Sequence, residues 1–408
     1  MKPSLFIAKR YFFSKKGKNF INIISNMSMI GVAVGTMALV IVLSVFNGLE
    51  NLIRSLYNTF DAEVKISLAK GKSFELTDEM LRKINGVEGV DIITEVIEDN
   101  ALLKYKEDQM VVKLKGVSEN FVKQRRMDSM MVDGSLALHK KEKELAIIGR
   151  GIQNIMSISL NDNFFELQLW YPKNKASVIT DPTKVFNREA IKPGGVFAIE
   201  KQYDDNYIFV PIAFTERLFN YGNRRTSIEI KAKNGYAVGN LEEDLQKALG
   251  PKFLIQNSDE QHAGLLKAIK IEKLFVYITF SFILAIASFN IFFSLTMLAI
   301  DKKKDVAILF SLGATKNFIK KLFLLEGSLI AFSGAFTGLF LGFLLCYLQQ
   351  ELGIVSMGME TSVVDAYPVK MQVSDFVITG FTILIITMIA SYRPAIRASK
   401  INVKDNLY

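Results

Sequence analysis

The stretch FINIISNMSMIGVAVGTMALVIVLSVF, residues 20–46, is apolar for longer than the roughly 20 residues that a membrane-spanning helix needs. Similar stretches follow at residues 274–300, 322–348 and 376–392, and the last is near the lower limit of length. The residues between the first two stretches alternate strand-like and helix-like segments of a water-soluble domain. The sequence therefore predicts an α-helical membrane protein with four transmembrane helices and a large α+β domain between helices 1 and 2.

Basic residues gather in three segments outside these stretches. Residues 1–19, 301–321 and 393–408 together carry a formal charge of +13, whereas the whole chain carries +9, so the remainder is close to −4. Lys and Arg flanking membrane helices are retained on the cytoplasmic side. The distribution predicts cytoplasmic N- and C-termini and an extracytoplasmic α+β domain, and it disfavours nucleic acid as a partner.

The expected organisation follows from these two patterns. From the N-terminus, a cytoplasmic interfacial amphipathic segment at 1–19 leads into the first span at 20–48, and an extracytoplasmic α+β domain with stalk ends follows at 49–272. The second span is expected at 273–300, a cytoplasmic segment at 301–321 and the third span at 322–348. An extracytoplasmic loop at 349–375, the fourth span at 376–392 and a cytoplasmic tail at 393–408 follow.

Within the α+β domain, apolar alternation predicts strands. They are expected at Ala62–Leu68, Val90–Lys106, Gln109–Gly116, Glu144–Gly149, Phe164–Tyr171, Gly195–Lys201, Tyr207–Pro211 and Thr226–Lys231. Thr77 is expected to cap a helix that ends at Gly86, and Asn240 with Glu243 to begin one that ends at Gly250. The polar segment Pro172–Pro193 is expected to be an extended loop or hairpin tip.

A long helix is expected after the domain. Ser258 and Gln261 resemble a capping box, and no helix breaker lies between Leu265 and Ile300. A continuous helix of this length would measure roughly 60 Å, about twice the hydrocarbon thickness of a bilayer. It would form a stalk. The alternative is a helix that breaks at the membrane surface.

Glycines spaced four residues apart predict a closely packed helix face. Gly31 and Gly35 lie four residues apart in the first span, and Gly334, Gly338 and Gly342 repeat that spacing in the third. Small residues let helices approach closely in lipid, where packing drives association. The alternative is the ordinary tolerance of membrane helices for glycine.

No motif for catalysis or cofactor binding is recognisable. Gly71-Lys72-Ser73 lacks the upstream glycine of a nucleotide-binding loop, and His139 and His262 are isolated and expected to be ordinary surface residues. Glu326 in the third span is either functional or within reach of interfacial water or a neighbouring Lys. The sequence predicts that this chain binds no cofactor and is not an enzyme, so a partner supplies the energy.

The segment DKKKDVAILFSLGATKNFIKK, residues 301–321, suits such a partner. Val306, Leu309, Phe310 and Gly313 recur at helical spacing, so a short helix would carry one apolar face rimmed by lysines such as Lys304. Apolar helix faces insert into grooves of partner proteins. The alternative is a helix lying on lipid headgroups.

This segment resembles the coupling segment of FtsX/MacB-type ABC transporter permeases. The resemblance rests on Lys304-Asp305-Val306-Ala307-Ile308-Leu309 and Leu312-Gly313-Ala314-Thr315, with support from Glu326-Gly327 and from Pro394-Ala395-Ile396-Arg397-Ala398-Ser399. The tail departs from the family pattern at Val403, where a proline is common.

The N-terminal quarter resembles the LolC/LolE lipoprotein-releasing permeases. The matching residues are Phe6-Ile7-Ala8-Lys9-Arg10-Tyr11, Asn22-Ile23-Ile24-Ser25, Ser28-Met29-Ile30-Gly31 and Ser44-Val45-Phe46-Asn47-Gly48-Leu49-Glu50. In the domain, Ile147-Ile148-Gly149, Gly195-Val196-Phe197 and Tyr207-Ile208-Phe209-Val210-Pro211 are similar to that family in the same order. Asn161-Asp162 stands where the family has Gly-Asp.

The resemblance implies an ATP-driven complex in the bacterial inner membrane. The chain would be a permease subunit that pairs with a second permease and with a LolD-like cytoplasmic ATPase, which binds ATP-Mg. The complex would extract acylated lipoproteins from the membrane and pass them to a periplasmic carrier for outer-membrane sorting. The alternatives are a MacB-like exporter and an FtsX-like permease that regulates a cell-wall enzyme.

Three sets of residues are expected to carry this function. Lys304, Val306, Leu309, Phe310 and Gly313 would dock on the ATPase. Met29, Val32, Thr36 and Val40 of the first span, with Phe280, Leu284 and Ala287 of the second, would line a cavity for the lipid anchor. Pro172, Lys173, Asn174, Lys175 and Pro182 would form a carrier-binding loop, and the alternative for that loop is a solvated segment.

Overall fold

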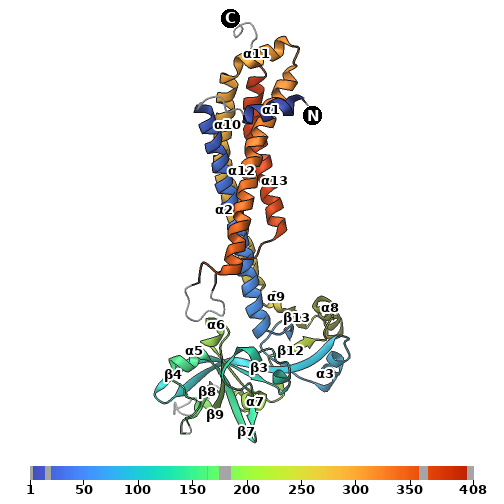
Figure 1. Ribbon diagram of the computed structural model, residues 1–408. Helices are drawn as coiled ribbons and strands as arrows, with labels where there is room; N and C mark the ends of the chain where they lie inside the picture. The colour runs from blue at the N-terminus through green and yellow to red at the C-terminus, as the bar shows by residue number, and fades with distance from the viewer. Residues whose placement is uncertain (1–2, 14–19, 163, 174–184, 358–365, 402–408) are drawn as a thin grey trace. The chain divides into compact units, whose positions relative to one another are not determined.

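The computed structural model describes residues 3–13, 20–162, 164–173, 185–357 and 366–401 (Figure 1). The chain divides into two compact units. One unit contains the described residues up to Leu52 and from Leu265 onward, and the other contains Ile53–Gly264. The first is a helical bundle and the second is an α+β domain.

Four helices of the bundle are long and apolar enough to cross a membrane: α2 (Phe20–Phe60), α10 (Ala263–Asp301), α12 (Lys316–Leu352) and α13 (Val373–Ala398). The short helix α11 (Lys303–Ser311) joins α10 to α12, and α1 (Pro3–Phe13) lies across the bundle against α12 (Figure 1). The predicted fold class of four membrane helices and a large α+β domain is confirmed.

Glycines form the seam between α2 and α12. A Cβ atom added to Gly338 would lie 2.4 Å from the carbonyl oxygen of Ala33, and one added to Gly334 would lie 2.7 Å from that of Met29. The backbones of the two helices therefore approach so closely that no larger residue fits. This seam confirms the close packing predicted from the third span, and its partner is the first span.

The helix expected from Ser258 to Ile300 contains one break. The side chain of Asn257, rather than that of Ser258, caps the short helix α9 (Ser258–Gln261), with Oδ1 accepting a hydrogen bond from the backbone N–H of Glu260. His262 separates α9 from α10, which then continues without interruption to Asp301. The helix is continuous over its apolar length.

The α+β domain is built on one large sheet and short helices. Its strands are β1 (Val64–Leu68), β2 (Phe74–Glu75), β3 (Val90–Tyr105), β4 (Asp108–Val117), β5 (Met131–Gly134), β6 (His139–Lys140), β7 (Lys143–Gly149), β8 (Leu167–Pro172), β9 (Phe186–Phe197), β10 (Tyr207–Pro211), β11 (Arg224–Arg225), β12 (Ser227–Ala232) and β13 (Phe253–Asn257). Its remaining helices are α3 (Asp78–Asn85), α4 (Asn120–Lys123), α5 (Arg150–Ile155), α6 (Lys201–Asp204), α7 (Ile212–Phe219) and α8 (Val238–Leu249), with a 3₁₀ turn at Asp128–Met130.

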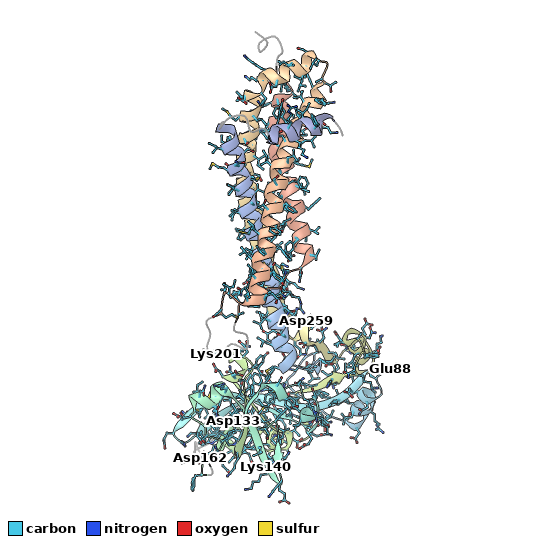
Figure 2. The ribbon with its side chains drawn as sticks, viewed as in Figure 1. Glu88, Asp133, Lys140, Asp162, Lys201 and Asp259 are labelled. Atoms are coloured by element: carbon cyan, nitrogen blue, oxygen red, sulfur yellow. The ribbon has the colours of Figure 1, made fainter. Side chains whose placement is uncertain are left out.

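The strand order of the large sheet is β13-β1-β12-β3-β4-β10-β7-β9-β5. Because β8 pairs with both β3 and β9, the pairings close a circuit through β3, β4, β10, β7, β9 and β8. Buried side chains of these strands, such as Leu103, Leu114, Ile148 and Leu169, form one core cluster. Figure 2 shows Lys140 at the tip of the β6–β7 hairpin, away from Glu88 beside α3.

Several predicted elements are confirmed and two are corrected. Thr77 caps α3 through its side chain, and β10 has the predicted bounds. The strand predicted from Gly195 begins at Phe186 instead, so part of the expected loop is the first half of β9. α8 begins at Val238 without a side-chain cap rather than at Asn240. Backbone pairing with β8 extends β9 despite Pro193.

A carboxylate lies among buried cations in the sheet. Glu229 on β12 accepts hydrogen bonds from Lys115 on β4 at 2.6 Å and from Arg126 at 2.5 Å. The Glu229 side chain is 2% exposed and that of Lys115 is 3% exposed. Burial alone would raise the pKa of this carboxyl, but the attraction of the two cations outweighs it and lowers the pKa to about 2.

His262 is not the ordinary surface residue that its isolation in the sequence predicts. Its imidazole stacks on Tyr57 with ring centroids 3.6 Å apart, and its Nε2 lies 2.6 Å from the carboxylate of Asp61. Arg54 and Asp259 form an ion pair beside it. The C-terminal turns of α2 and the residues that follow β13 are therefore joined by both ring stacking and charge.

Candidate functional site

The candidate site is the turn between α10 and α12, built on α11. Thr315 ends the turn by accepting a hydrogen bond from the backbone N–H of Phe318, which fixes the start of α12. Gly313 adopts φ +92°, a conformation that L-residues rarely take, so the chain can reverse directly after α11. The sequence thus fixes the connection from α11 to α12.

One face of α11 packs against the bundle itself. Val306 is 0% exposed and lies in a cluster with Phe323 of α12 and Ala395 of α13. Leu309 and Phe310 are half-buried against the same cluster. In this arrangement Val306 presents no surface to a partner, because the apolar face predicted for docking covers the chain's own core.

A second face of α11 points outward. Lys304, Ile308 and Leu312 follow one another at intervals of four residues, which places them on one side of the helix. Ile308 is 50% exposed and Leu312 is 79% exposed, and Lys304 and Gly313 are also exposed. We define Lys304, Ile308 and Leu312 as the outer stripe. The spacing of these three residues can be seen in the sequence, but the sequence alone favours the alternative apolar stripe through Val306 as the docking face.

The α1 helix contacts the same end of the bundle. Lys302 lies over the ring of Tyr11, with its Nζ 5.7 Å from the ring centroid. Burial, followed by the nearby carboxylate of Asp305, raises the pKa of the Tyr11 hydroxyl to about 12. The phenol therefore stays neutral, and it ties α1 to the residues that lead into α11.

The seven residues predicted to line a lipid-anchor cavity fall into two groups. Val32, Thr36 and Val40 are 0% exposed on α2, and Leu284 is 1% exposed on α10. Val32, Thr36 and Val40 face the glycines of α12, and Leu284 faces Gly35. The other three, which are partly exposed, are Met29, Phe280 and Ala287. Their role in the assembled transporter stays a prediction.

Larger apolar side chains on the same two helices face outward instead. On α2 they include Met27, Ile30 and Val34, and on α10 they include Phe282, Ile286 and Phe289, all at least half exposed. These side chains are accessible to lipid or to another chain.

The predicted carrier-binding loop is only partly visible. Pro172 ends β8, and Lys173 follows it with its backbone N–H bonded to the carbonyl of Val185. Both are exposed. Asn174, Lys175 and Pro182 lie outside the described residues, so the role of this loop stays a prediction.

A polar cluster inside the bundle was not expected from the sequence. Asn47 of α2 donates through Nδ2 to Asp375 of α13 at 2.6 Å and accepts through Oδ1 from Lys273 of α10 at 2.6 Å. Lys273 also lies 3.5 Å from Asp375. One amide therefore joins three membrane helices, and each of its polar atoms has a partner. We call Asn47, Lys273 and Asp375 the amide bridge.

Glu326 of α12 is buried elsewhere in the bundle and is 4% exposed. Its Oε2 atom has no hydrogen-bond partner among the described residues, and neither does Ser391 Oγ on α13. A Cβ atom added to the neighbouring Gly327 would lie 2.3 Å from that hydroxyl oxygen. The role of Glu326 stays a prediction.

The described part of the chain contains no group of three or more His, Cys, Asp and Glu side chains arranged to hold a metal ion. The candidate site presents an apolar and basic stripe on a short helix that packs against α10, α12 and α13.

Comparisons with known proteins cover most of the chain. Residues 25–248 match the model of the MacB-like periplasmic core domain, and residues 277–403 match that of the FtsX-like permease C-terminal region. The chain is 24% identical to the lipoprotein-releasing system transmembrane protein LolE of Haemophilus influenzae, over 98% of both chains. It is 25% identical to LolC of Buchnera aphidicola, over 96% of this chain and 94% of that one.

A solved structure is also similar, the periplasmic region of MacB from Actinobacillus actinomycetemcomitans, at 14% identity with a TM-score of 0.35 over 51% of this chain and 95% of that one. The two family models cover the α+β domain and the last three membrane helices. The chain therefore belongs to the FtsX/MacB-type permeases of ABC transporters.

Proposed function

We propose that this protein is the permease subunit of an ABC complex that releases lipoproteins from the bacterial inner membrane. The observation that carries the proposal is similarity along nearly the whole chain to proteins named as lipoprotein-releasing, with both the α+β domain and the membrane helices included. The cargo would be acylated lipoproteins, and a periplasmic carrier would receive them.

The orientation follows from charge. The basic segments 301–321 and 393–401 flank the end of the bundle where α11 lies, so this end is cytoplasmic. The α+β domain is then periplasmic. ATP-Mg binds a separate LolD-like ATPase, and this chain contributes no catalytic residue.

The outer stripe is the proposed contact with the ATPase. Burial of a Leu or Ile side chain contributes about 1.5–3 kcal/mol, so Ile308 and Leu312 together supply a firm anchor. Lys304 and Gly313, at the two ends of the stripe, keep their predicted roles in docking. Leu309 and Phe310 position the outer stripe, because they pack α11 against the bundle.

Coupling of ATP binding to movement of the permease requires that ATP bind two arrangements of the ATPase dimer with different affinities. ATP shifts the ATPase dimer toward one arrangement only if the ligand binds the two arrangements unequally. Because Val306 fixes α11 to α12 and α13, a displacement of α11 moves these helices as well. A second permease, identical or different, completes the complex, and the exposed apolar residues of α2 and α10 provide the surface for it and for the lipid anchor.

The test is a pull-down of the full chain from its own host in mild detergent, with identification of bound proteins and of acylated cargo. We expect a bound ABC ATPase and triacylated lipoproteins with the wild-type chain. Leu312→Asp should remove the ATPase and leave the chain in the membrane. Leu352→Asp, at an exposed position at the far end of α12, is the matched control.

Two outcomes contradict the proposal. Retention of the ATPase by both Leu312→Asp and Ile308→Asp would exclude the outer stripe as the contact. A complex that contains the ATPase but carries no acylated protein would exclude lipoprotein release and favour the second candidate, a MacB-like exporter or an FtsX-like permease that regulates a cell-wall enzyme. The matches to both family models are what favour that candidate.

A further inference from the structure

Helices α10 and α13 run side by side but are in contact over only part of their length. At one end they are joined by the amide bridge, and further along the two helices the hydroxyls of Tyr277 and Thr382 lie 2.5 Å apart. Beyond this point a groove of about 800 Å³ separates them. Its volume falls within the range of sites that take small molecules, about 300–1,000 Å³.

The walls of the groove are apolar and come from one face of each helix. Ala285, Phe289 and Phe292 follow at helical spacing on α10, and Ile386 and Ile389 do so on α13. Phe289 is 61% exposed and Ile389 is 71% exposed. Because this part of the chain lies at membrane depth, the walls are suited to hydrocarbon.

The end of the groove toward α11 is basic. Arg393 is part of the lining and follows Tyr392, whose ring is covered by Lys320 of α12 with its Nζ 4.4 Å from the centroid. Arg393 is exposed, and no carboxylate of the described chain forms an ion pair with it. Two cations therefore lie at one end of the apolar groove, and neither forms an ion pair with a carboxylate of the described residues.

We propose that this groove binds an anionic phospholipid. Its acyl chain would lie between Phe289 and Ile389, and its phosphate would face Arg393, with Lys320 beside it. The apolar walls favour a hydrocarbon chain, and the basic end favours a negatively charged headgroup. Basic pockets between membrane helices bind anionic lipid headgroups in this way. The site lies apart from the outer stripe and does not depend on the identity of the cargo.

The experiment is native mass spectrometry of the purified full chain, titrated with phosphatidylglycerol or with phosphatidylcholine of the same acyl chains. We expect preferential binding of phosphatidylglycerol. Arg393→Gln should weaken phosphatidylglycerol binding about five-fold, the effect of one basic residue near a membrane surface, and leave phosphatidylcholine unchanged. Arg397→Gln, an exposed arginine one turn further along α13, is the matched control and should change neither.

The hydrocarbon part of the site has its own test. Ala285→Trp should fill the groove and weaken binding of both lipids, whereas Val377→Trp on an exposed part of α13 should not. If Ala285→Trp does not elute at the wild-type volume, Ala390→Trp fills the groove from the facing helix. Equal binding of the two lipids by the wild type, or equal effects of Arg393→Gln and Arg397→Gln, would overturn the proposal. So would disulfide-linked dimers of Ile389→Cys in membranes, which would assign the groove to a second copy.

Discussion

The two units of this protein bury charge in different ways. In the α+β domain, Glu229 is surrounded by two cations inside a core rich in aromatic rings. In the bundle, the charges of Lys273 and Asp375 are joined through the amide of Asn47, and Glu326 retains an oxygen without a partner in the described structure. The carboxylate in the domain is therefore fully paired. The bundle contains one cluster whose polar atoms are paired and one carboxylate with an oxygen that is unpaired among the described residues.

The difference follows from the solvent of each unit. Apolar burial drives a domain in water to fold, so its buried ion pair is surrounded by a core that would hold without it. Between membrane helices the hydrophobic effect gives little preference, and close backbone approach and polar contacts hold the helices together. We therefore expect polar contacts and close approach at glycines to stabilise the bundle, whereas apolar packing stabilises the domain.

Removing the central carboxylate should be the largest single effect. Glu229→Ala leaves Lys115 and Arg126 buried without a counter-charge, and breaking a buried pair in this way costs about 3–5 kcal/mol. Emission from Trp170, the chain's one tryptophan, reports unfolding of the α+β domain during a urea titration of the full chain in detergent. Glu243→Ala, which removes an exposed pair with Lys247, is the control and should cost little. A loss below about 1 kcal/mol for Glu229→Ala would contradict the contrast between the units.

Breaking the amide bridge should come next. Lys273→Met leaves the carboxylate of Asp375 with Asn47 alone, and because the Lys273 side chain is 25% exposed we expect about 2 kcal/mol, less than for a fully buried pair. Cys346, buried on α12, is the chain's one cysteine, and its rate of maleimide labelling reports opening of the bundle. The double variant Lys273→Met with Asp375→Asn should recover part of the loss. Labelling of the double variant that is no slower than that of the single variant would show that the charge pair contributes nothing.

The glycine seam gives a smaller but cleaner effect. Gly338→Ala brings a methyl group within 2.4 Å of the Ala33 carbonyl, so α2 and α12 must separate at a cost of about 1–3 kcal/mol. Gly380→Ala on α13 is the control, because no described atom lies within 4 Å of its added Cβ. Faster Cys346 labelling should accompany Gly338→Ala only. Equal rates in the two variants would mean that α2 and α12 are not held by close approach.

The smallest expected effect is on the pH dependence of stability, which should differ between two buried carboxylates of the domain, Asp204 and Glu229. Burial raises the pKa of Asp204 to about 6, although backbone N–H groups such as that of Ile199 partly offset it. The folded value lies above the ordinary value, so the stability that protonation gives is present below pH 4 and is lost as the pH rises through 6. Asp204→Asn keeps the acceptor oxygen and should remove this dependence on pH.

Glu229 should show the opposite dependence. Its pKa of about 2 lies below the ordinary value, so its contribution is present above about pH 4.5 and is lost as the pH falls toward 2. Urea titrations at pH 4, 5, 6 and 7, followed through Trp170, separate the two groups. A wild-type domain that gains stability between pH 5 and 7 would contradict the assignment to Asp204.

The sequence was sufficient where a signal is local. Apolar length predicted the four membrane helices, Thr77 predicted the start of α3, and the run Tyr207–Pro211 predicted a strand with the correct ends. Each of these depends on neighbours within a few residues, or on composition averaged over a span, so a single sequence contains the information.

Contacts between distant segments could not be predicted. The amide bridge joins residues 226 and 328 positions apart in the chain, and no local pattern marks them as partners. The start of β9 at Phe186 is likewise set by pairing with β8. On α11 the sequence offered two apolar stripes, and only the packed structure shows that the one through Val306 is inside and that Ile308 and Leu312 are outside.

Gly313 has a consequence for the handedness of the turn. Its φ of +92° lies in the region that glycine shares with D-amino acids, and no described atom within 4 Å would meet a side chain there. Chirality, and not volume, is therefore what excludes other residues. A chain assembled by chemical ligation with D-alanine at this position should keep its reversal intact, whereas the mirror-related L-alanine should strain it.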